Sequence, residues 1–376
     1  MDKSRQVAVI AGGYLGDEGK GKATQVQIER LAQRSRPTLV CRASGGTNTG
    51  ATIQTPAGPI GIHMLPVGAF TPECHSYIGS AVYLNPSKLE QELEYRKKIF
   101  AGYTMGKVYI ARNCHIVKPE YLIEDADKES AQSLGSTKNG VSIAASYKYR
   151  YEGQQAHQLP SFTINKLNRE YGVELVDPLE FFEGIAREWD VIIEGSQGIG
   201  LDVNHGFEYP YVSAGSFSTY GLLDGMGYAL APDEVMMVLK TYGSYFGPIR
   251  YRGNFEDAEF RKFAGEYGTT TKRPRNLCWL DADLLRRAAS FIRPTTIMLN
   301  HLDTIMWFAE HGKKWGMVID DEQFLTFDDV PLTRTLSGSY NLTKSGSLFV
   351  ETIEEYCGAK VGYIGVGPSF TDVIER

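Results

Sequence analysis

A glycine-rich stretch at residues 12–22 constrains this chain more than any other part of its sequence. It follows an apolar run, 7–11, that indicates a buried strand, and a helix can begin near Gly21 and continue over 23–32. A strand, a glycine-rich turn and a helix N-terminus in this order bind phosphate, because backbone N–H groups and the helix dipole face the anion. The spacing of the Walker A motif is not met, so the sequence predicts a phosphate site of another kind.

Two carboxylates within this turn, Asp17 and Glu18, limit its chemistry. A triphosphate repels a carboxylate unless a metal ion lies between them or the carboxylate transfers a proton. Lys20 and Lys22 add positive charge to the same turn. The turn therefore predicts a phosphate and magnesium site with a built-in candidate base. The alternative is a solvated turn whose charges are incidental.

Composition excludes several classes of protein. The chain has 376 residues and a net charge of −6, so no general affinity for nucleic acid or anionic membranes is expected. Its five cysteines are scattered without a CxxC pair, which indicates free thiols in a reducing compartment. No apolar run approaches the roughly 18 residues of a membrane helix, and the polar N-terminus is not a signal peptide. We expect a cytoplasmic protein.

Apolar strand patterns alternate with helical patterns along the chain, which predicts an α/β fold with a largely parallel central sheet and flanking helices. The expected strands are 7–11, 38–41, 189–194, 235–241, 295–300 and 361–366, and the expected helices between them include 86–100, 163–171 and 281–291. Long segments without a clean period (42–70, 125–160, 196–232 and 243–277) are expected to be active-site loops. No linker or repeat is visible, so we expect a single domain over 1–376.

Polar segments after several strands supply further candidate residues. The segments 44–52 and 135–140 can offer amides and hydroxyls to an anion, although a plain turn explains either one alone. Gln197 follows a predicted strand and can bind a base edge or a phosphate, whereas the alternative for its neighbour Ser196 is a helix N-cap.

Two later segments carry stronger signals. Residues 268–275 hold three threonines, one lysine and two arginines, and Arg273 and Arg275 can each bind a carboxylate or a phosphate in a forked geometry. A solvated basic loop is the alternative. Asp303 closes an apolar strand, where its carboxylate can accept hydrogen bonds from guanine or cap a helix.

Taken together, these segments resemble the adenylosuccinate synthetase family over nearly the whole chain. The matching motifs are 16–22, 45–52, 135–137, 194–198 with 209–212, 268–275 with 279–281, and 302–303. The resemblance implies a fold similar to P-loop GTPases and a ligase that joins aspartate to carbon 6 of IMP while hydrolysing GTP with Mg²⁺. It also implies that Asp17 accepts the proton of purine N1, after which the 6-oxygen is phosphorylated and the aspartate amine displaces phosphate.

The resemblance further implies a role for each of a larger set of residues. Asp17, Lys20 and Gln197 are the catalytic group, and Asp17 and the carbonyl of Gly50 bind the metal. The triphosphate contacts Gly16, Glu18, Gly19, Lys20, Gly21, Lys22, Gly50, Ala51, Thr52, Asn300, His301, Asp303, Gly367 and Pro368. The purine monophosphate contacts Asp17, Asn48, Ser136, Thr137, Arg150, Gln197, Ser213 and Arg273, and aspartate contacts Thr270, Thr271, Arg273 and Arg275. In the family, the arginine at the position of Arg150 reaches across from a second subunit, which implies a homodimer.

Several positions depart from the family pattern, mostly near the purine and the triphosphate. The usual Gln-Trp before the loop Gly-Asp is Tyr14-Leu15, the catalytic histidine is Ala51, and the lysine that packs on guanine is His301. Either another group such as His63 supplies the missing donor, or the enzyme works without it. GTP or ATP therefore remain alternatives as the energy donor.

A branch of the family in some bacteriophages uses dGMP in place of IMP and makes a precursor of 2-aminoadenine DNA. The short chain and the altered purine-side residues fit that branch and would place the protein in the host cytoplasm, whereas Asp17, which many of its members replace, fits IMP. We expect dGMP, with IMP as the alternative. The second alternative is a nucleotide-binding regulator that lost catalysis with the histidine.

Overall fold

The computed structural model describes residues 4–55, 57–127, 138–268, 272–335 and 338–376. Its central sheet has ten strands: β1 (Val7–Gly12), β2 (Thr38–Arg42), β5 (His75–Ile78), β7 (Val108–Ala111), β9 (Val173–Val176), β10 (Asp190–Gly198), β11 (Glu234–Lys240), β15 (Thr296–Asn300), β20 (Val361–Gly365) and β21 (Val373–Glu375). The spatial order is β21-β20-β15-β11-β1-β10-β2-β5-β7-β9, and only β21 runs antiparallel to its neighbour. The predicted α/β fold with a largely parallel sheet is confirmed.

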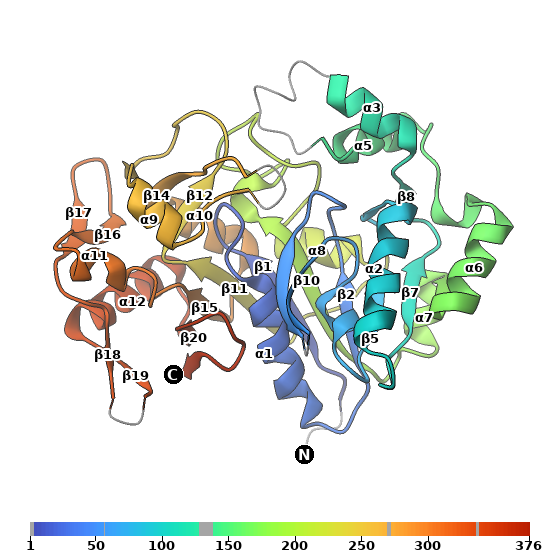
Figure 1. Cartoon of the computed structure of the whole chain (residues 1–376), viewed down its shortest axis with the longest axis horizontal. Helices are drawn as coiled ribbons and strands as arrows, with labels where there is room; N and C mark the ends of the chain where they lie inside the picture. Colours follow the sequence, from blue (N-terminus) through green and yellow to red (C-terminus); the bar gives the residue numbers. More distant parts are fainter. Residues whose placement is uncertain (1–3, 56, 128–137, 269–271, 336–337) are drawn as a thin grey trace.

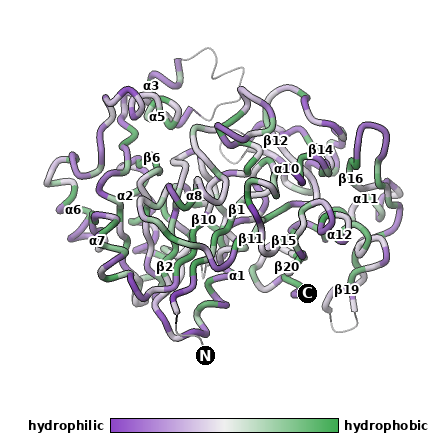
Figure 2. The backbone as a smooth tube through the Cα atoms, turned by 180° about the vertical axis from the view of Figure 1, so that it is seen from behind, coloured by the Kyte–Doolittle hydropathy of each residue, from purple (hydrophilic) through white to green (hydrophobic). Residues whose placement is uncertain are grey.

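The central strands are apolar along their whole length because helices and loops cover both faces of the sheet. Every residue of β1, β2 and β7 is buried. Figure 2 shows the same strands as a hydrophobic centre within a more hydrophilic periphery. All six strands predicted from the sequence are present, and their ends agree within one residue, except that β10 continues four residues beyond its expected end, to Gly198.

Helices flank the sheet, and several begin at the capping residues that the sequence provides. They are α1 (Lys20–Ala32), α2 (Pro86–Ile99), α3 (Pro119–Asp127), α5 (Val141–Tyr149), α6 (Ser161–Tyr171), α7 (Pro178–Glu183), α8 (Thr219–Gly225), α9 (Ala258–Phe263), α10 (Ala282–Ile292), α11 (Met306–Glu310) and α12 (Lys344–Cys357), with 3₁₀ turns η1 (Val67–Phe70), η2 (Ala156–Gln158) and η3 (Ile199–Leu201). Asn85, Asp281 and Thr343 cap α2, α10 and α12 through their side-chain oxygens. No helix among the described residues is both long and apolar enough to cross a membrane.

A second, five-stranded sheet was not predicted. It contains β12 (Tyr242–Tyr245), β13 (Asn254–Phe255), β14 (Asn276–Asp281), β16 (Trp315–Val318) and β17 (Phe324–Phe327). Figure 1 shows it on the side of the central sheet opposite α2 and α6. One continuous hydrophobic cluster spans both sheets, so the strands of the second sheet are fixed against the central one.

Three two-stranded pairs complete the fold: β3 (Ala51–Thr55) with β4 (Gly58–Ile62), β6 (Tyr83–Leu84) with β8 (His115–Ile116), and β18 (Leu332–Arg334) with β19 (Tyr340–Leu342). The segments that were expected to be loops also contain regular structure: the β3–β4 hairpin, most of β12, and helices α5, α8 and α9. Ser196 lies within β10, and its hydroxyl is 2.9 Å from that of Ser44, so the alternative of a helix N-cap at Ser196 is wrong.

Candidate active site

A cavity of about 950 Å³ opens where the carboxyl ends of β1, β10 and β15 meet β12 of the second sheet. Ligands of open α/β sheets bind at this edge. Most of the candidate residues line the cavity: Gly16, Asp17, Glu18, Gly19, Lys20, Gly21, Lys22, Asn48, Gly50, Ala51, Thr52, Gln197, Ser213, Arg275, Asn300, His301, Asp303, Gly367 and Pro368. The fold therefore brings together segments that are hundreds of residues apart.

The remaining candidates fall into two groups. Ser136, Thr137, Thr270 and Thr271 lie outside the described residues. Arg150 and Arg273 are described but are not part of the cavity lining. Arg150 is paired with Glu152 at the surface, and Arg273 lies 5.1 Å from the ring centre of Phe246. Arg275 is thus the arginine of segment 268–275 that faces the cavity.

The phosphate loop is organised by Glu18. This carboxylate is almost fully buried, and its Oε1 accepts hydrogen bonds from the backbone N–H of Tyr14 (3.1 Å) and Gly16 (2.7 Å). Its Oε2 lies 2.6 Å from Lys20 Nζ, at the start of α1. Glu18 therefore holds the loop and Lys20 in place rather than offering a free negative charge.

Asp17 points away from this internal network. Its side chain is 56% exposed and its backbone has a φ of 60°, a left-handed conformation that Asp tolerates better than most residues. It forms an ion pair with Arg275, which directly precedes β14 of the second sheet. Desolvation would raise the pKa of Asp17, but Arg275 and Lys240 outweigh it and hold that pKa well below its ordinary value. Asp17 is thus an ionised carboxylate at the mouth of the phosphate loop.

Behind Arg275 lies a buried charged cluster that the sequence analysis did not identify. Glu266 accepts hydrogen bonds from Lys240 Nζ (2.7 Å), the Tyr242 hydroxyl (2.8 Å) and Arg275 Nη1 (3.0 Å). Burial opposes its ionisation, yet Lys240 and Arg275 lower the pKa of Glu266 to about 2. A lysine at the end of a strand and a glutamate before a substrate loop were visible signals, but nothing in the sequence paired them.

The β3–β4 hairpin places His63 beside the residues expected to bind metal and phosphate. Ala51 pairs with Ile62 across the hairpin, so His63 follows directly. His63 Nδ1 lies 2.6 Å from the Thr49 carbonyl, and its backbone N–H donates to buried Glu92 at 2.7 Å. A Cβ added to Gly50 would lie 4.0 Å from His63 Cε1. The imidazole therefore lies next to Gly50 and Ala51 in the cavity wall.

Residues after β15 and the C-terminal segment form the opposite end of the cavity. Asn300 Nδ2 donates to the Glu18 carbonyl at 2.8 Å, which ties this end to the phosphate loop. Lys22 Nζ donates to the carbonyls of Gly367 and Asp372, both at 2.8 Å. Burial lowers the pKa of Lys22 to about 8 despite Asp372 and Asp303, and burial raises the pKa of Asp303.

Burial also lowers the pKa of His301 to about 4, with Lys240 contributing, so this imidazole is neutral at pH 7. A neutral imidazole cannot provide the cation that the family's lysine would bring to the same position.

Three buried side-chain oxygens of cavity-lining residues have no hydrogen-bond partner among the described residues: Asn48 Oδ1, Thr49 Oγ1 and Asn300 Oδ1. An unpaired buried polar group costs about 1–3 kcal/mol. Asn300 Oδ1 is packed against Gly365 and Thr49 Oγ1 against Gly45, so closely that a Cβ added to either glycine would clash with it. Of the three atoms, Asn48 Oδ1 is therefore the one where a donor on a ligand would be stabilising. Gln197 Nε2 donates to the Asn48 carbonyl at 3.2 Å, so Asn48 and Gln197 form one polar wall.

Magnesium fits the oxygen donors at this site. The described residues contain no cluster of three or more His, Cys, Asp or Glu side chains that could bind a metal alone. Mg²⁺ does not need one, because it is often bound by one or two protein oxygens together with water and substrate phosphates. Exposed Asp17 and the neighbouring phosphate loop meet that requirement.

A matching family model and known proteins of similar sequence point to one family. The family model of adenylosuccinate synthetase matches residues 9–177 and 175–311. A curated adenylosuccinate synthetase of Thermotoga maritima is 30% identical over 404 residues, covering 98% of this chain and 99% of the relative. One of Methanosphaera stadtmanae is 27% identical over 371 residues, covering 98% and 97%. The short length is therefore shared with a relative of that name.

Two solved structures show the same fold. Fully ligated adenylosuccinate synthetase from Plasmodium falciparum has a TM-score of 0.82 and 22% identity, covering 99% of this chain and 100% of its own. Succinoaminodeoxyadenylate synthetase (PurZ) of cyanophage S-2L, bound to dGMP and dATP, has a TM-score of 0.72 and 21% identity, covering 99% and 95%.

Proposed function

This chain belongs to the adenylosuccinate synthetase family and is a carbon–nitrogen ligase, and from that premise we propose that it joins L-aspartate to carbon 6 of dGMP. The observation that carries the ligase assignment is the ion pair between Asp17 and Arg275, 258 residues apart in the chain. It brings the candidate base of the phosphate loop into contact with the candidate aspartate-binding loop. A purine bound at Asp17 would therefore lie beside an aspartate bound at Arg275.

The proposed reaction has two steps. The ionised Asp17 accepts the proton of purine N1, which leaves negative charge on the 6-oxygen. That oxygen attacks the γ-phosphorus of the triphosphate, the bond to the β-phosphate breaks, and the nucleoside diphosphate leaves. The aspartate amine then attacks carbon 6 and phosphate leaves. Charge on the transferring phosphoryl group is stabilised by Lys20, by the backbone N–H groups at the start of α1 and by Gln197. Bound magnesium, held by Asp17 and the Gly50 carbonyl, would neutralise the phosphate oxygens.

His63 is our candidate for the donor that Ala51 lacks. It lies beside Gly50, its backbone is fixed by Glu92, and its Nδ1 is taken by the Thr49 carbonyl. With Nδ1–H donating to that carbonyl, Nε2 can donate to a phosphate oxygen only in the doubly protonated imidazolium form. Loss of one such donor costs about 10²–10³ in rate, so a replacement within the same wall would preserve activity.

The choice of dGMP as the substrate rests on the positions at which this chain departs from the family pattern. The nucleotide side carries Tyr14, Leu15, Ala51 and His301 in place of the family residues, whereas the arginines of segment 268–275 are retained. The unpaired Asn48 Oδ1 supports the choice, because the 2-amino group of dGMP is a donor that IMP lacks. The cyanophage protein of the same fold binds dGMP and dATP.

IMP is the second candidate, with GTP as the donor. It is favoured by Asp17 and by the name of the relatives, adenylosuccinate synthetase. For the energy donor, Asp303 lines the cavity and would accept from guanine, but neutral His301 removes the cation that would pack on the base. We therefore propose that both ATP and GTP are accepted.

The remaining expectations are also proposals. We propose a homodimer in which Arg150, exposed at the end of α5, reaches the monophosphate of the neighbouring subunit, and a single domain over 1–376. Ser136, Thr137 and Ser213 would contact the same nucleotide, and Thr270, Thr271 and Arg273 would join Arg275 around aspartate.

A phosphate-release assay tests the ligase assignment against a regulatory role. Purified protein is given ATP or GTP, magnesium and dGMP or IMP, with and without aspartate, and the product is identified by mass spectrometry. A ligase releases phosphate in proportion to a succinylated nucleotide. Nucleotide binding without aspartate-dependent product would contradict the assignment and favour a regulator.

A further inference from the structure

A buried ion pair joins the two sheets beside the cavity. Lys240 is the last residue of β11 in the central sheet, and Glu266 lies between α9 and β14 on the second-sheet side. Their side chains are 2% and 4% exposed and their Nζ and Oε1 atoms are 2.7 Å apart. Lys240 Nζ also donates to Ser244 Oγ at 2.8 Å, and the Tyr242 hydroxyl donates to Glu266 at 2.8 Å. The position of Glu266 is therefore fixed from several directions.

Glu266 in turn holds Arg275, the residue directly before β14, through two hydrogen bonds. The Arg275 backbone N–H donates to the Glu266 carbonyl at 3.0 Å, which closes the base of the loop between them. The Glu266 side chain uses its other oxygen, Oε2, to accept from Arg275 Nη1 at 3.0 Å. Glu266 therefore holds Arg275 twice, with its backbone carbonyl on the Arg275 main chain and with its carboxylate on the Arg275 guanidinium.

This arrangement leaves one edge of the Arg275 guanidinium open. Its Nη1 contacts both Glu266 and Asp17, whereas its Nε and Nη2 make no hydrogen bond to the described residues. Nε and Nη2 form the edge that binds a carboxylate with two parallel hydrogen bonds. Arg275 lines the cavity, so that edge is available to a ligand there.

We propose that Glu266, locked by Lys240 and Tyr242, is a positioning residue for the substrate L-aspartate, acting by aiming the open edge of Arg275 at a substrate carboxylate. The inference rests on the proposed ligase function. It adds to that function a buried triad from two sheets that sets the orientation of the aspartate-binding arginine. Both carboxylate oxygens of Glu266 are engaged by Lys240, Tyr242 and Arg275, so the proposed role is exercised through Arg275.

The direction in which the KM for aspartate changes when Glu266 is neutralised distinguishes this positioning role from charge repulsion alone. A carboxylate near the binding site of a dicarboxylate repels it, so neutralising Glu266 would lower the KM for aspartate if charge alone mattered. If Glu266 orients Arg275, the same change raises that KM. A misplacement of about 1 Å can cost about 10²-fold, so an increase of about 10- to 100-fold is expected.

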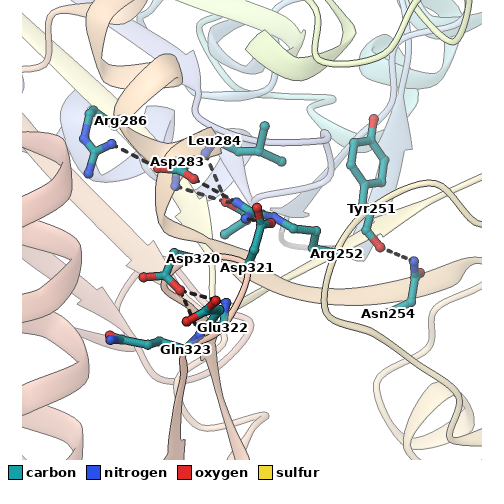
Figure 3. Close-up of polar contacts among 11 residues, drawn as sticks. Tyr251, Arg252, Asn254, Asp283, Leu284, Arg286, Asp320, Asp321, Glu322 and Gln323 are labelled. Atoms are coloured by element: carbon teal, nitrogen blue, oxygen red, sulfur yellow. Dashed lines mark hydrogen bonds and ion pairs between the residues drawn. The ribbon is translucent and has the colours of Figure 1, made fainter.

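The matched control lies at the far end of β14, the strand that follows Glu266 and Arg275. Asp281 on β14 is also a buried carboxylate paired with an arginine, since Arg252 Nε and Nη2 lie 2.7 and 2.8 Å from its oxygens. Figure 3 shows Arg252 in this second network, where it also reaches Asp283 and Asp321. Asp281 and Arg252 do not line the cavity. Asp281→Asn therefore loses a comparable buried charge without touching the site.

The experiment measures kcat and the KM of aspartate, monophosphate and triphosphate for the wild type, Glu266→Gln and Asp281→Asn, with melting temperatures. We expect both variants to melt at lower temperature, and only Glu266→Gln to raise the aspartate KM about tenfold or more, with nucleotide KM values within about threefold. An unchanged or lowered aspartate KM would overturn the proposal. So would an equal rise for all substrates, or the same rise in Asp281→Asn.

Tyr242→Phe keeps both charges and tests the proposal if Glu266→Gln does not fold. Loss of the one hydrogen bond should raise the aspartate KM by about two- to fivefold, and no change would overturn the proposal. A wild type that forms no aspartate-dependent product contradicts the proposed function instead. An active wild type with unaltered variants contradicts the positioning role alone.

Discussion

The two sides of the cavity each use a buried glutamate to hold a cation, but they do so over very different distances in the chain. In the phosphate loop, Glu18 pairs with Lys20, two residues away. On the aspartate side, Glu266 pairs with Lys240, 26 residues away, across the boundary between two sheets. The first side is a local structure that forms within one turn. The second exists only once both sheets are packed together.

This difference between the two sides of the cavity parallels the distribution of the positions at which the chain departs from the family pattern. The phosphate side carries most of the departures from the family, Tyr14, Leu15, Ala51 and His301, around a loop that Glu18 keeps intact. The aspartate side keeps its arginines and is held by a network that spans the molecule. A local loop can accept new neighbours without disturbing the fold, whereas a change in the buried network would alter both sheets.

The largest effect is expected at the contact between the two sides. Asp17→Ala should abolish turnover while leaving the fold intact, because the purine 6-oxygen loses its activating proton transfer and an exposed side chain contributes little to stability. General-base catalysis alone accounts for about 10²–10⁴ in rate. Steady-state rates with a circular dichroism control measure this. Near-normal turnover would remove Asp17 from the mechanism.

Removal of Arg275 should affect one substrate only. Arg275→Ala loses a buried, charge-assisted contact, which costs about 2–5 kcal/mol when one partner is truncated. We expect this loss in kcat/KM for aspartate, with nucleotide KM values nearly unchanged. Arg273→Ala, outside the cavity lining, should have a smaller effect. A raised nucleotide KM with an unchanged aspartate KM would mean that the loop binds phosphate.

Removal of the Glu18 side chain should affect the phosphate side of the cavity. Glu18→Ala leaves the buried N–H groups of Tyr14 and Gly16 without their acceptor, at about 1–3 kcal/mol each. We expect a lower free energy of unfolding in urea and a higher triphosphate KM, with the aspartate KM unchanged. If the aspartate KM rose equally, the two sides would not be independent.

The smallest effect concerns acid stability. The folded-state pKa of Glu266 is lowered from 4.5 to about 2. Its stabilising contribution is therefore fully present above pH 4.5 and is lost as the pH falls through about 2. At pH 3 about 2 kcal/mol of it should be gone. Urea unfolding at pH 6 and pH 3 should show the difference between wild type and Glu266→Gln shrinking by that amount. A constant difference would contradict the assigned pKa.

The same contrast explains what the sequence could predict. Strands such as β1 and β10 were predicted because they are buried on both faces, and their apolar runs therefore carry a strong signal. The phosphate loop was predicted because its glycines, Asp17 and Lys20 are contiguous. Arg275 and Asp303 were recognised by position within local motifs.

What was missed depends on distant contacts. The second sheet has short strands, and β12 and β13 lie in a segment without clear periodicity. The pairing of Lys240 with Glu266, and of Arg275 with Asp17, requires two sheets to meet, which no local pattern encodes. Glu18 was expected to face the triphosphate, but its hydrogen bonds to its own loop appear only when the turn is built.

The most direct test of the account is the choice of purine. With aspartate saturating, kcat/KM is measured for dGMP and for IMP on the same wild-type preparation. An acceptor built for the 2-amino group is left unpaired by IMP, at about 1–3 kcal/mol, so we predict a value for dGMP at least about tenfold higher. Efficient turnover of IMP with none of dGMP would contradict the account and assign ordinary adenylosuccinate synthesis to this chain.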